Sequence, residues 1–161
     1  MLRSRLVPAL AAVSAVFLMT REPVGPAPLV LTRLTYDAGA SLTPAISPDG
    51  NLVAYASDRG GDGALDIWVR HINRPEPVRL TRHPADDWMP RFSPDGRRVL
   101  YGIRRDPTLW ADRVRLAVWD IGSHELVRRS EAHEYLVNFL FWDRHGEKVW
   151  SSSSDGNLKG W

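Results

Sequence analysis

Residues 33–59 read RLTYDAGASLTPAISPDGNLVAYASDR, and residues 79–105, which lie 46 positions further along, read RLTRHPADDWMPRFSPDGRRVLYGIRR. The two stretches share 11 identical residues in 27 positions, including RLT at the start and SPDG in the middle. A third, more divergent unit follows at a shift of 50, where Gly146 takes the place of Gly96. Self-similarity at such a period is the signature of a repeat architecture with one supersecondary unit per repeat.

Each unit carries the signals of short strands joined by tight turns. In Ser-Pro-Asp-Gly the proline presets φ for the first corner, the aspartate bonds nearby backbone, and the glycine accepts a positive φ. An apolar run over residues 52–56 follows the first turn, and residues 65–70 and 114–119 alternate in the manner of half-buried strands. Short strands in units of 46–50 residues predict an all-β fold: a partial β-propeller of about three four-stranded blades.

Residues 29–96 resemble the TolB-type propeller repeats of bacteria, through the pieces LTRLTYDAG, PAISPDGNLVAYASDRGGDGALDIWV and RLTRHPADDWMPRFSPDG. Propellers of this type resemble the periplasmic TolB protein. They also occur fused to membrane-anchored bacterial kinases and transcriptional regulators, and in front of prolyl-oligopeptidase-type hydrolases. The resemblance therefore implies a bacterial propeller and leaves several roles open.

Residues 117–161 resemble a WD repeat instead. Trp119-Asp120 stands where that family has its terminal dipeptide, and Ala132-His133 stands where it usually has Gly-His. The family holds each blade together with a hydrogen-bonded set of Asp, His, Ser or Thr, and Trp. Carried over to this chain, the resemblance implies a structural hydrogen-bond set made of His133, Ser151, Asp155 and Trp161.

Composition excludes several classes of protein. The chain of 161 residues is 43% hydrophobic and 25% charged, as expected of a globular domain. Its net charge of +2 comes from the first 21 residues, which hold three arginines and no acid. The remainder has 18 basic and 19 acidic residues, so it lacks the basic footprint of a nucleic-acid binder. Because cysteine is absent, disulfides, thiolate metal sites and a cysteine nucleophile are excluded.

The start of the chain has the pattern of an export signal. Arg3 and Arg5 precede an uncharged, mostly apolar run over residues 6–19, which is the pattern of a secretory n-region and h-region. The positive-inside rule then places the bulk of the chain in the periplasm or elsewhere outside the cytoplasm, held at the membrane if the segment is not cleaved. We expect a signal peptide or membrane anchor over 1–21, a linker over 22–28 and a partial propeller over 29–161.

Two loops hold candidate binding groups. Asp86, Asp87 and Trp88 look like a loop that enters the first strand of the next blade, which makes them candidate contacts for a ligand at the propeller rim. The glycine-rich stretch over residues 58–66 holds three aspartates of the kind that Ca²⁺ takes as ligands. Because this stretch is a single copy without a calcium-loop spacing, it favours a plain hairpin turn. We therefore expect no metal site and no cofactor.

The sequence contains no motif for catalysis, neither a G-x-S-x-G elbow nor a Walker loop nor a dinucleotide fingerprint. We expect a protein without enzymatic activity that binds a protein partner, or senses signals, in the cell envelope. Two alternatives stay open: the propeller portion of a prolyl-oligopeptidase-type hydrolase, and the sensor domain of a membrane-anchored kinase or transcriptional regulator. Because propellers close with roughly four to eight blades, the repeat count predicts a fragment of a larger propeller or one assembled from several chains.

Overall fold

The computed structural model describes residues 28–36, 39–74, 76–105 and 113–161. Every regular element in these ranges is a β-strand, and they contain no helix able to cross a membrane. The strands are β1 (Ser41–Ile46), β2 (Leu52–Ser57), β3 (Asp66–His71), β4 (Val78–Arg79), β5 (Asp86–Phe92), β6 (Arg98–Arg104), β7 (Val114–Asp120), β8 (Glu125–His133), β9 (Val137–Trp142), β10 (Val149–Ser153) and β11 (Leu158–Gly160).

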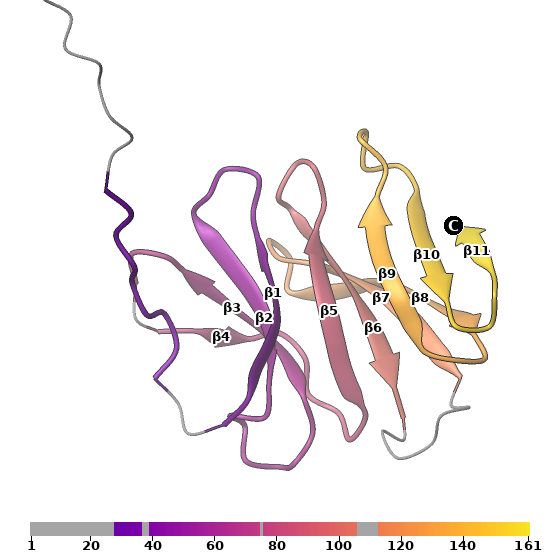
Figure 1. Ribbon diagram of the computed structural model, residues 1–161, viewed down its shortest axis with the longest axis horizontal. Helices are drawn as coiled ribbons and strands as arrows, with labels where there is room; N and C mark the ends of the chain where they lie inside the picture. Colours follow the sequence, from indigo (N-terminus) through magenta and orange to yellow (C-terminus); the bar gives the residue numbers. More distant parts are fainter. Residues whose placement is uncertain (1–27, 37–38, 75, 106–112) are drawn as a thin grey trace, which may run out of the picture. The chain divides into compact units, whose positions relative to one another are not determined.

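The strands form three antiparallel meanders, which we call blade 1 (β1–β4), blade 2 (β5–β8) and blade 3 (β9–β11) (Figure 1). The predicted all-β architecture of propeller blades is confirmed. Blades 1 and 2 have the expected four strands, whereas blade 3 has three among the described residues. The stretch that resembles a WD repeat spreads over two blades, because β7 and β8 pair with β6 rather than with β9.

The chain divides into two compact units, residues 1–33 and 34–161, and the blades belong to the second unit. Of the first unit the structure describes residues 28–33, which form no strand. The predicted signal peptide or anchor over 1–21 and nearly all of the predicted linker over 22–28 lie outside the described residues. Both therefore stay predictions.

The repeated Ser-Pro-Asp-Gly turns close the first hairpin of blades 1 and 2. In blade 1 the amide of Gly50 donates to the carbonyl of Ser47 at 2.8 Å, and the Ser47 hydroxyl donates to Asp49 at 2.5 Å. Gly50 has a φ of 73°, a conformation that glycine adopts without strain. In blade 3 the amide of Gly146 donates to the carbonyl of Asp143 at 3.2 Å, so the same turn forms although the Ser-Pro-Asp sequence is lost.

Apolar side chains fill the spaces between neighbouring blades. Because strand pleating sends alternate residues to opposite faces, β6 supplies Val99 and Tyr101 to the core between blades 1 and 2, and Leu100 to the core between blades 2 and 3. Core 1 consists of Ala54, Ala56, Ile67, Val69, Leu80, Ala85, Val99, Tyr101, Ile103 and Ala117. Core 2 consists of Met89, Leu100, Val114, Leu116, Val118, Ala132, Val137, Leu140 and Val149. The blades thus stack face to face, as propeller blades do.

The first strands of blades 1 and 2 share a bulge that joins the blades. Thr43 and Met89, at the same position of the repeat, have φ values of 48° and 54°. The strand registers of β1 and β5 shift at these residues. The amide of Met89 donates to the Thr43 hydroxyl at 3.1 Å, so the bulge of one blade contacts the bulge of the next.

Candidate functional site

The structure brings together the four residues of the predicted hydrogen-bond set. His133 lies at the end of β8, Ser151 lies in β10, Asp155 follows β10 and Trp161 follows β11. His133 Nδ1 is 2.8 Å from Asp155 Oδ2, and its Nε2 is 2.8 Å from Ser151 Oγ. Trp161 Nε1 donates to the same Ser151 Oγ at 3.0 Å. The set therefore links the last strand of blade 2 to blade 3.

The hydrogen bonds run from Asp155 through His133 to Ser151, as in a Ser-His-Asp catalytic triad. The question is therefore whether Ser151 could act as a nucleophile. A nucleophilic serine must reach a substrate carbonyl. Ser151 is fully buried between the blades, and the indole of Trp161 already donates to its hydroxyl oxygen. All polar atoms of the set are satisfied if His133 carries its proton on Nδ1 and the Ser151 hydroxyl donates to Nε2. The geometry fits a structural link between blades 2 and 3, in which the Ser151 hydroxyl is buried and already hydrogen-bonded.

The charge of Asp155 is stabilised within this set. Desolvation is the largest single influence on the pKa of Asp155 and raises it. The backbone amide of Asn157 and the His133 ring together outweigh desolvation and lower the pKa from 3.8 to about 2. The amide of Asn157 donates to Asp155 Oδ1 at 2.9 Å. Asp155 therefore stays ionised at neutral pH and orients the histidine ring.

A second buried polar group holds the second copy of Arg-Leu-Thr, residues 79–81. Asp66 is fully buried at the start of β3, and it binds the guanidinium of Arg79 and the hydroxyl of Thr81. The Thr81 hydroxyl also accepts from the amide of Ile67 at 2.9 Å. Burial raises the pKa of Asp66, and Arg79 opposes that shift. The repetition of Arg-Leu-Thr was visible in the sequence, but its partner, an aspartate 13 positions upstream of the arginine, was not predicted.

The candidate rim contacts lie elsewhere than expected. Asp87 is fully buried, because the alternation of β5 turns it toward the interior, so the prediction of a rim contact is wrong for this residue. Asp86 Oδ1 accepts from the amide of Leu65 at 2.9 Å and so joins blade 1 to blade 2. Trp88 is half-buried and packs against both cores. All three residues serve the packing between blades.

The three aspartates of residues 58–66 do not converge on one point. Asp58 accepts from the amide of Ala40 at 2.8 Å, whereas Asp62 and Asp66 both bind Arg79. Within the described ranges no group of three or more histidine or acidic side chains could hold a metal ion.

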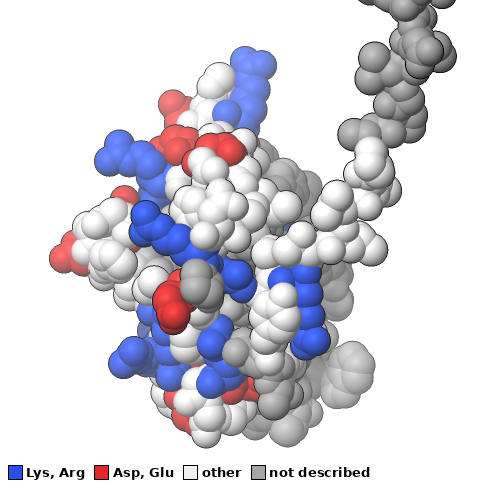
Figure 2. Space-filling view, turned by 90° about the vertical axis from the view of Figure 1, so that its left-hand side faces the viewer, with Lys and Arg blue, Asp and Glu red and all other residues white. Residues whose placement is uncertain are grey.

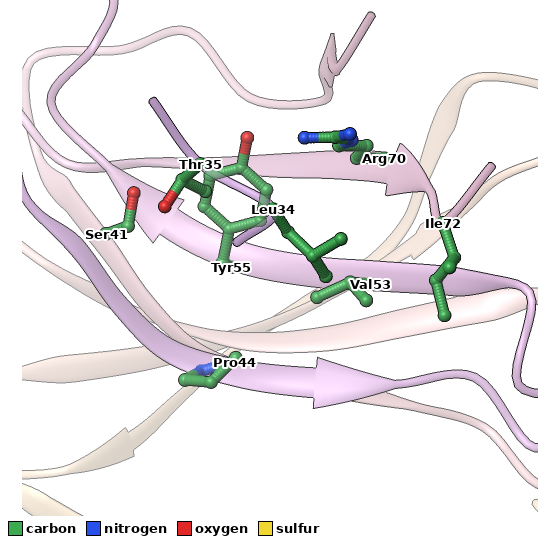
Figure 3. A pocket seen from close by; sticks show the side chains of 8 residues that line it. All are labelled: Leu34, Thr35, Ser41, Pro44, Val53, Tyr55, Arg70 and Ile72. Carbon is green, nitrogen blue, oxygen red and sulfur yellow. The ribbon is translucent and has the colours of Figure 1, made fainter. Parts of the chain in front are cut away.

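A small apolar hollow of about 190 Å³ lies beside Val53 and Tyr55 of β2 (Figure 3). Because Ala54 and Ala56 of the same strand face core 1, the hollow is on the face of blade 1 that points away from blade 2. Leu34 reaches toward Val53 and Tyr55 of β2, and Pro44 of β1 borders the hollow. One repeat later the corresponding residues Leu80, Val99 and Tyr101 lie in core 1. The hollow is thus the counterpart of a space that is filled between blades.

A larger hollow of about 540 Å³ lies on blade 2 and is rich in arginine. Among the described residues that line it, Glu131 of β8 is the one acid; it lies 3.5 Å from Arg113 and 3.3 Å from Arg115. Arg105 and Arg129 also line the hollow, and neither forms an ion pair with a described residue. On the face shown in Figure 2, basic groups are interspersed with acidic ones.

Comparison with known proteins supports the fold. No family model matches the chain. An uncharacterized protein of Agrobacterium fabrum is 35% identical over 124 residues, which are 74% of this chain and 42% of that protein. A Sulfurisphaera tokodaii protein described as a Tricorn-like protease N-terminal subunit is 34% identical over 70 residues, 44% of this chain and 32% of that protein.

Among solved structures, one described as a TolB of Agrobacterium tumefaciens superposes with a TM-score of 0.58 at 22% identity. The match covers 75% of this chain and 48% of that one. The chain thus spans less than half the length of the relatives it matches. At this identity the likeness shows the fold, which is a TolB-like β-propeller.

Proposed function

We propose that this chain is an exported binding module of the cell envelope, in which TolB-like blades present the arginine-rich hollow of blade 2 to an acidic segment of a protein partner. The observation that carries the proposal is the charge of the hollow, where four arginines and one glutamate stand among the described lining residues. Arginine is enriched at the centres of protein interfaces. Its guanidinium also binds carboxylates through two parallel hydrogen bonds.

The arrangement of the arginines fits this role. Arg115 lies in β7 beside Glu131 of β8, so the strand register fixes its position. Arg129, two residues before Glu131 on β8, is exposed at the same hollow. Because sheet residues hold these side chains, the hollow is preorganised, which reduces the entropy lost when a partner binds.

Affinity purification from the envelope of the producing bacterium tests the proposed partner. We expect a protein that co-purifies with the wild-type chain and is lost with the double substitution Arg115→Glu and Arg129→Glu. The matched control is Arg97→Glu with Arg128→Glu, which changes the net charge equally outside the hollow's lining. Equal recovery with both double variants would contradict the assignment of the hollow.

The export proposal rests on Arg3, Arg5 and the apolar run over residues 6–19. A reporter that works only outside the cytoplasm, fused after Pro28, should be active, and a reporter that works only in the cytoplasm should be inactive at the same point. Arg3→Glu together with Arg5→Glu should reduce export. High activity of the cytoplasmic reporter would refute the export signal.

A second candidate function follows from the protein described as a Tricorn-like protease subunit. In that case the chain is the propeller portion of a peptidase, and the partner bound at the hollow carries the catalytic serine. Labelling the co-purified partner with a fluorophosphonate probe distinguishes the two functions. In both cases we propose that the chain acts by binding rather than by catalysis, with its last blade held by a WD-type hydrogen-bond set.

A further inference from the structure

The contact between neighbouring blades is regular. A Cβ placed on Gly96 of blade 2 would lie 3.6 Å from Pro48 Cδ of blade 1, and one placed on Gly146 of blade 3 would lie 3.3 Å from Pro94 Cδ of blade 2. Pro94 follows Pro48 by 46 residues and Gly146 follows Gly96 by 50, which are the two repeat shifts. The same pair of positions therefore touches at both interfaces.

Both outer faces of the three-blade stack expose large apolar side chains. The outer face of blade 3 presents Phe139 and Phe141 of β9, which are 66% and 46% exposed because Leu140 between them points into core 2. The outer face of blade 1 presents Ile46, which pairs with Val53 and is 65% exposed. Each face repeats positions that are covered inside the stack.

The contacts between neighbouring blades, transferred by repeat position, predict which residues would meet if the two outer faces packed together. Between blades 2 and 3, Trp142 Nε1 donates to the carbonyl of Arg91 at 3.3 Å. Phe141 of blade 3 occupies the repeat position of Arg91, and Ile46 of blade 1 occupies that of Trp142. If blade 1 of another copy followed blade 3, the same contact would therefore pair Ile46 with Phe141. Phe139 of blade 3 occupies the repeat position of Thr43, and Thr43 occupies that of Met89. The contact between Met89 and Thr43 would therefore recur between Thr43 of the other copy and Phe139. One exposed apolar side chain of each outer face, Phe141 and Ile46, thus falls opposite the other.

We propose that the outer face of blade 3 in one copy of this chain packs on the outer face of blade 1 in a second copy, and the reverse, so that two copies close a ring. The interface continues the one already present between the blades of a single chain. Two copies of the three described blades make about six, within the roughly four to eight blades of propellers. A head-to-tail interface of this kind forms a closed ring when the rotation between units matches.

The segment before blade 1 fits the same arrangement. Leu34 lies on Val53 and Tyr55 (Figure 3), in the place that Leu80 occupies against Val99 and Tyr101. Leu80 follows β4, the outermost strand of the preceding blade. In the ring, the segment around Leu34 of one copy therefore lies at the outer edge of blade 3 in the other, next to β11. The inference is independent of the proposed function, because the arginine-rich hollow belongs to neither outer face.

Engineered cysteines test the ring in the full chain, which has no natural cysteine. Copies carrying Ile46→Cys are mixed with tagged copies carrying Phe141→Cys and treated with a short bismaleimide. We expect cross-links between the two kinds of copy and none between identical copies. Leu126→Cys in place of Ile46→Cys is the matched control, since Leu126 is 45% exposed but lies on neither outer face.

Light scattering after gel filtration gives the second readout. We expect twice the mass of the chain, and a dissociation constant raised about tenfold or more by Phe141→Asp but not by Leu126→Asp. A monomer at micromolar concentration, which would leave other blades or another protein as the occupant, overturns the proposal. So do cross-links between two Phe141→Cys copies, which indicate a face-to-face dimer, or a ladder of larger assemblies.

Discussion

Two buried polar residues, His133 and Asp87, meet the cost of burial in opposite ways. His133 uses both ring nitrogens within a satisfied set. Desolvation by burial raises the pKa of Asp87 and outweighs its polar contacts, in which the Thr81 hydroxyl lowers the pKa and His83 Nε2 lies 3.2 Å from Oδ1. The first residue therefore links blades 2 and 3 through satisfied hydrogen bonds, while burial of the second raises its pKa.

The His133 set predicts coupled losses of stability. His133→Ala and Asp155→Ala should each lower the free energy of unfolding by about 1–3 kcal/mol, because each leaves a buried partner unsatisfied. The double variant should lose clearly less than the sum. Urea unfolding measures the three values, and His145→Ala, at an exposed position, serves as the control. Intact stability with abolished partner binding would instead make His133 a functional residue.

Asp87 predicts a pH dependence of stability. Burial raises its pKa from 3.8 to about 8, so between these values the folded chain binds a proton that the unfolded chain has released. Stability should therefore fall as the pH rises through this window, and level off above it. Asp87→Asn should flatten the curve, measured by urea unfolding between about pH 5 and about pH 8. An unchanged slope in this variant would show that a group other than Asp87 is responsible; His83 would not be that group, because burial lowers its pKa and so makes stability rise with pH.

At the scale of strands and turns, the structure separates what the sequence could predict from what it could not. The Ser-Pro-Asp-Gly turns were predictable because each residue has a local reason to be there. The bulges at Thr43 and Met89 were not, since neither residue type favours a positive φ. The burial of Asp87 was also missed, because the bulge and the alternation of β5 set its direction. The His133 set was predicted through resemblance to WD repeats, not from spacing.

Alanine substitutions at two turn glycines, Gly146 and Gly156, should destabilise the chain to different extents. Gly146 and Gly156 have φ values of 71° and 82°, so alanine at either should cost about 1–2 kcal/mol of backbone strain. A Cβ on Gly146 would also lie 3.3 Å from Pro94 Cδ, whereas nothing lies within 4 Å of one on Gly156. Gly146→Ala should therefore destabilise more than Gly156→Ala in thermal unfolding. Equal losses would mean that the contact between blades 2 and 3 yields without cost.

At the scale of the whole blade stack, two cores must act together for the chain to unfold as one unit. Each core lies between two blades, and blade 2 contributes alternate residues of the same strands to both. Repeat proteins of this kind gain stability from each unit and from each interface between neighbours. Cooperativity therefore depends on side chains that touch both interfaces, and Trp88 is such a residue.

Trp88→Ala tests this dependence on blade 2. Removing a packed tryptophan from between two cores should lower the free energy of unfolding by about 3–5 kcal/mol. It should also separate the unfolding of blade 1 from that of blade 3, because their shared contact is gone. Hydrogen exchange resolves the two events, with β2 and β10 reporting on different blades. Leu126→Ala should leave one transition, and a single transition in Trp88→Ala as well would show that strands β5–β8 couple the cores without this side chain.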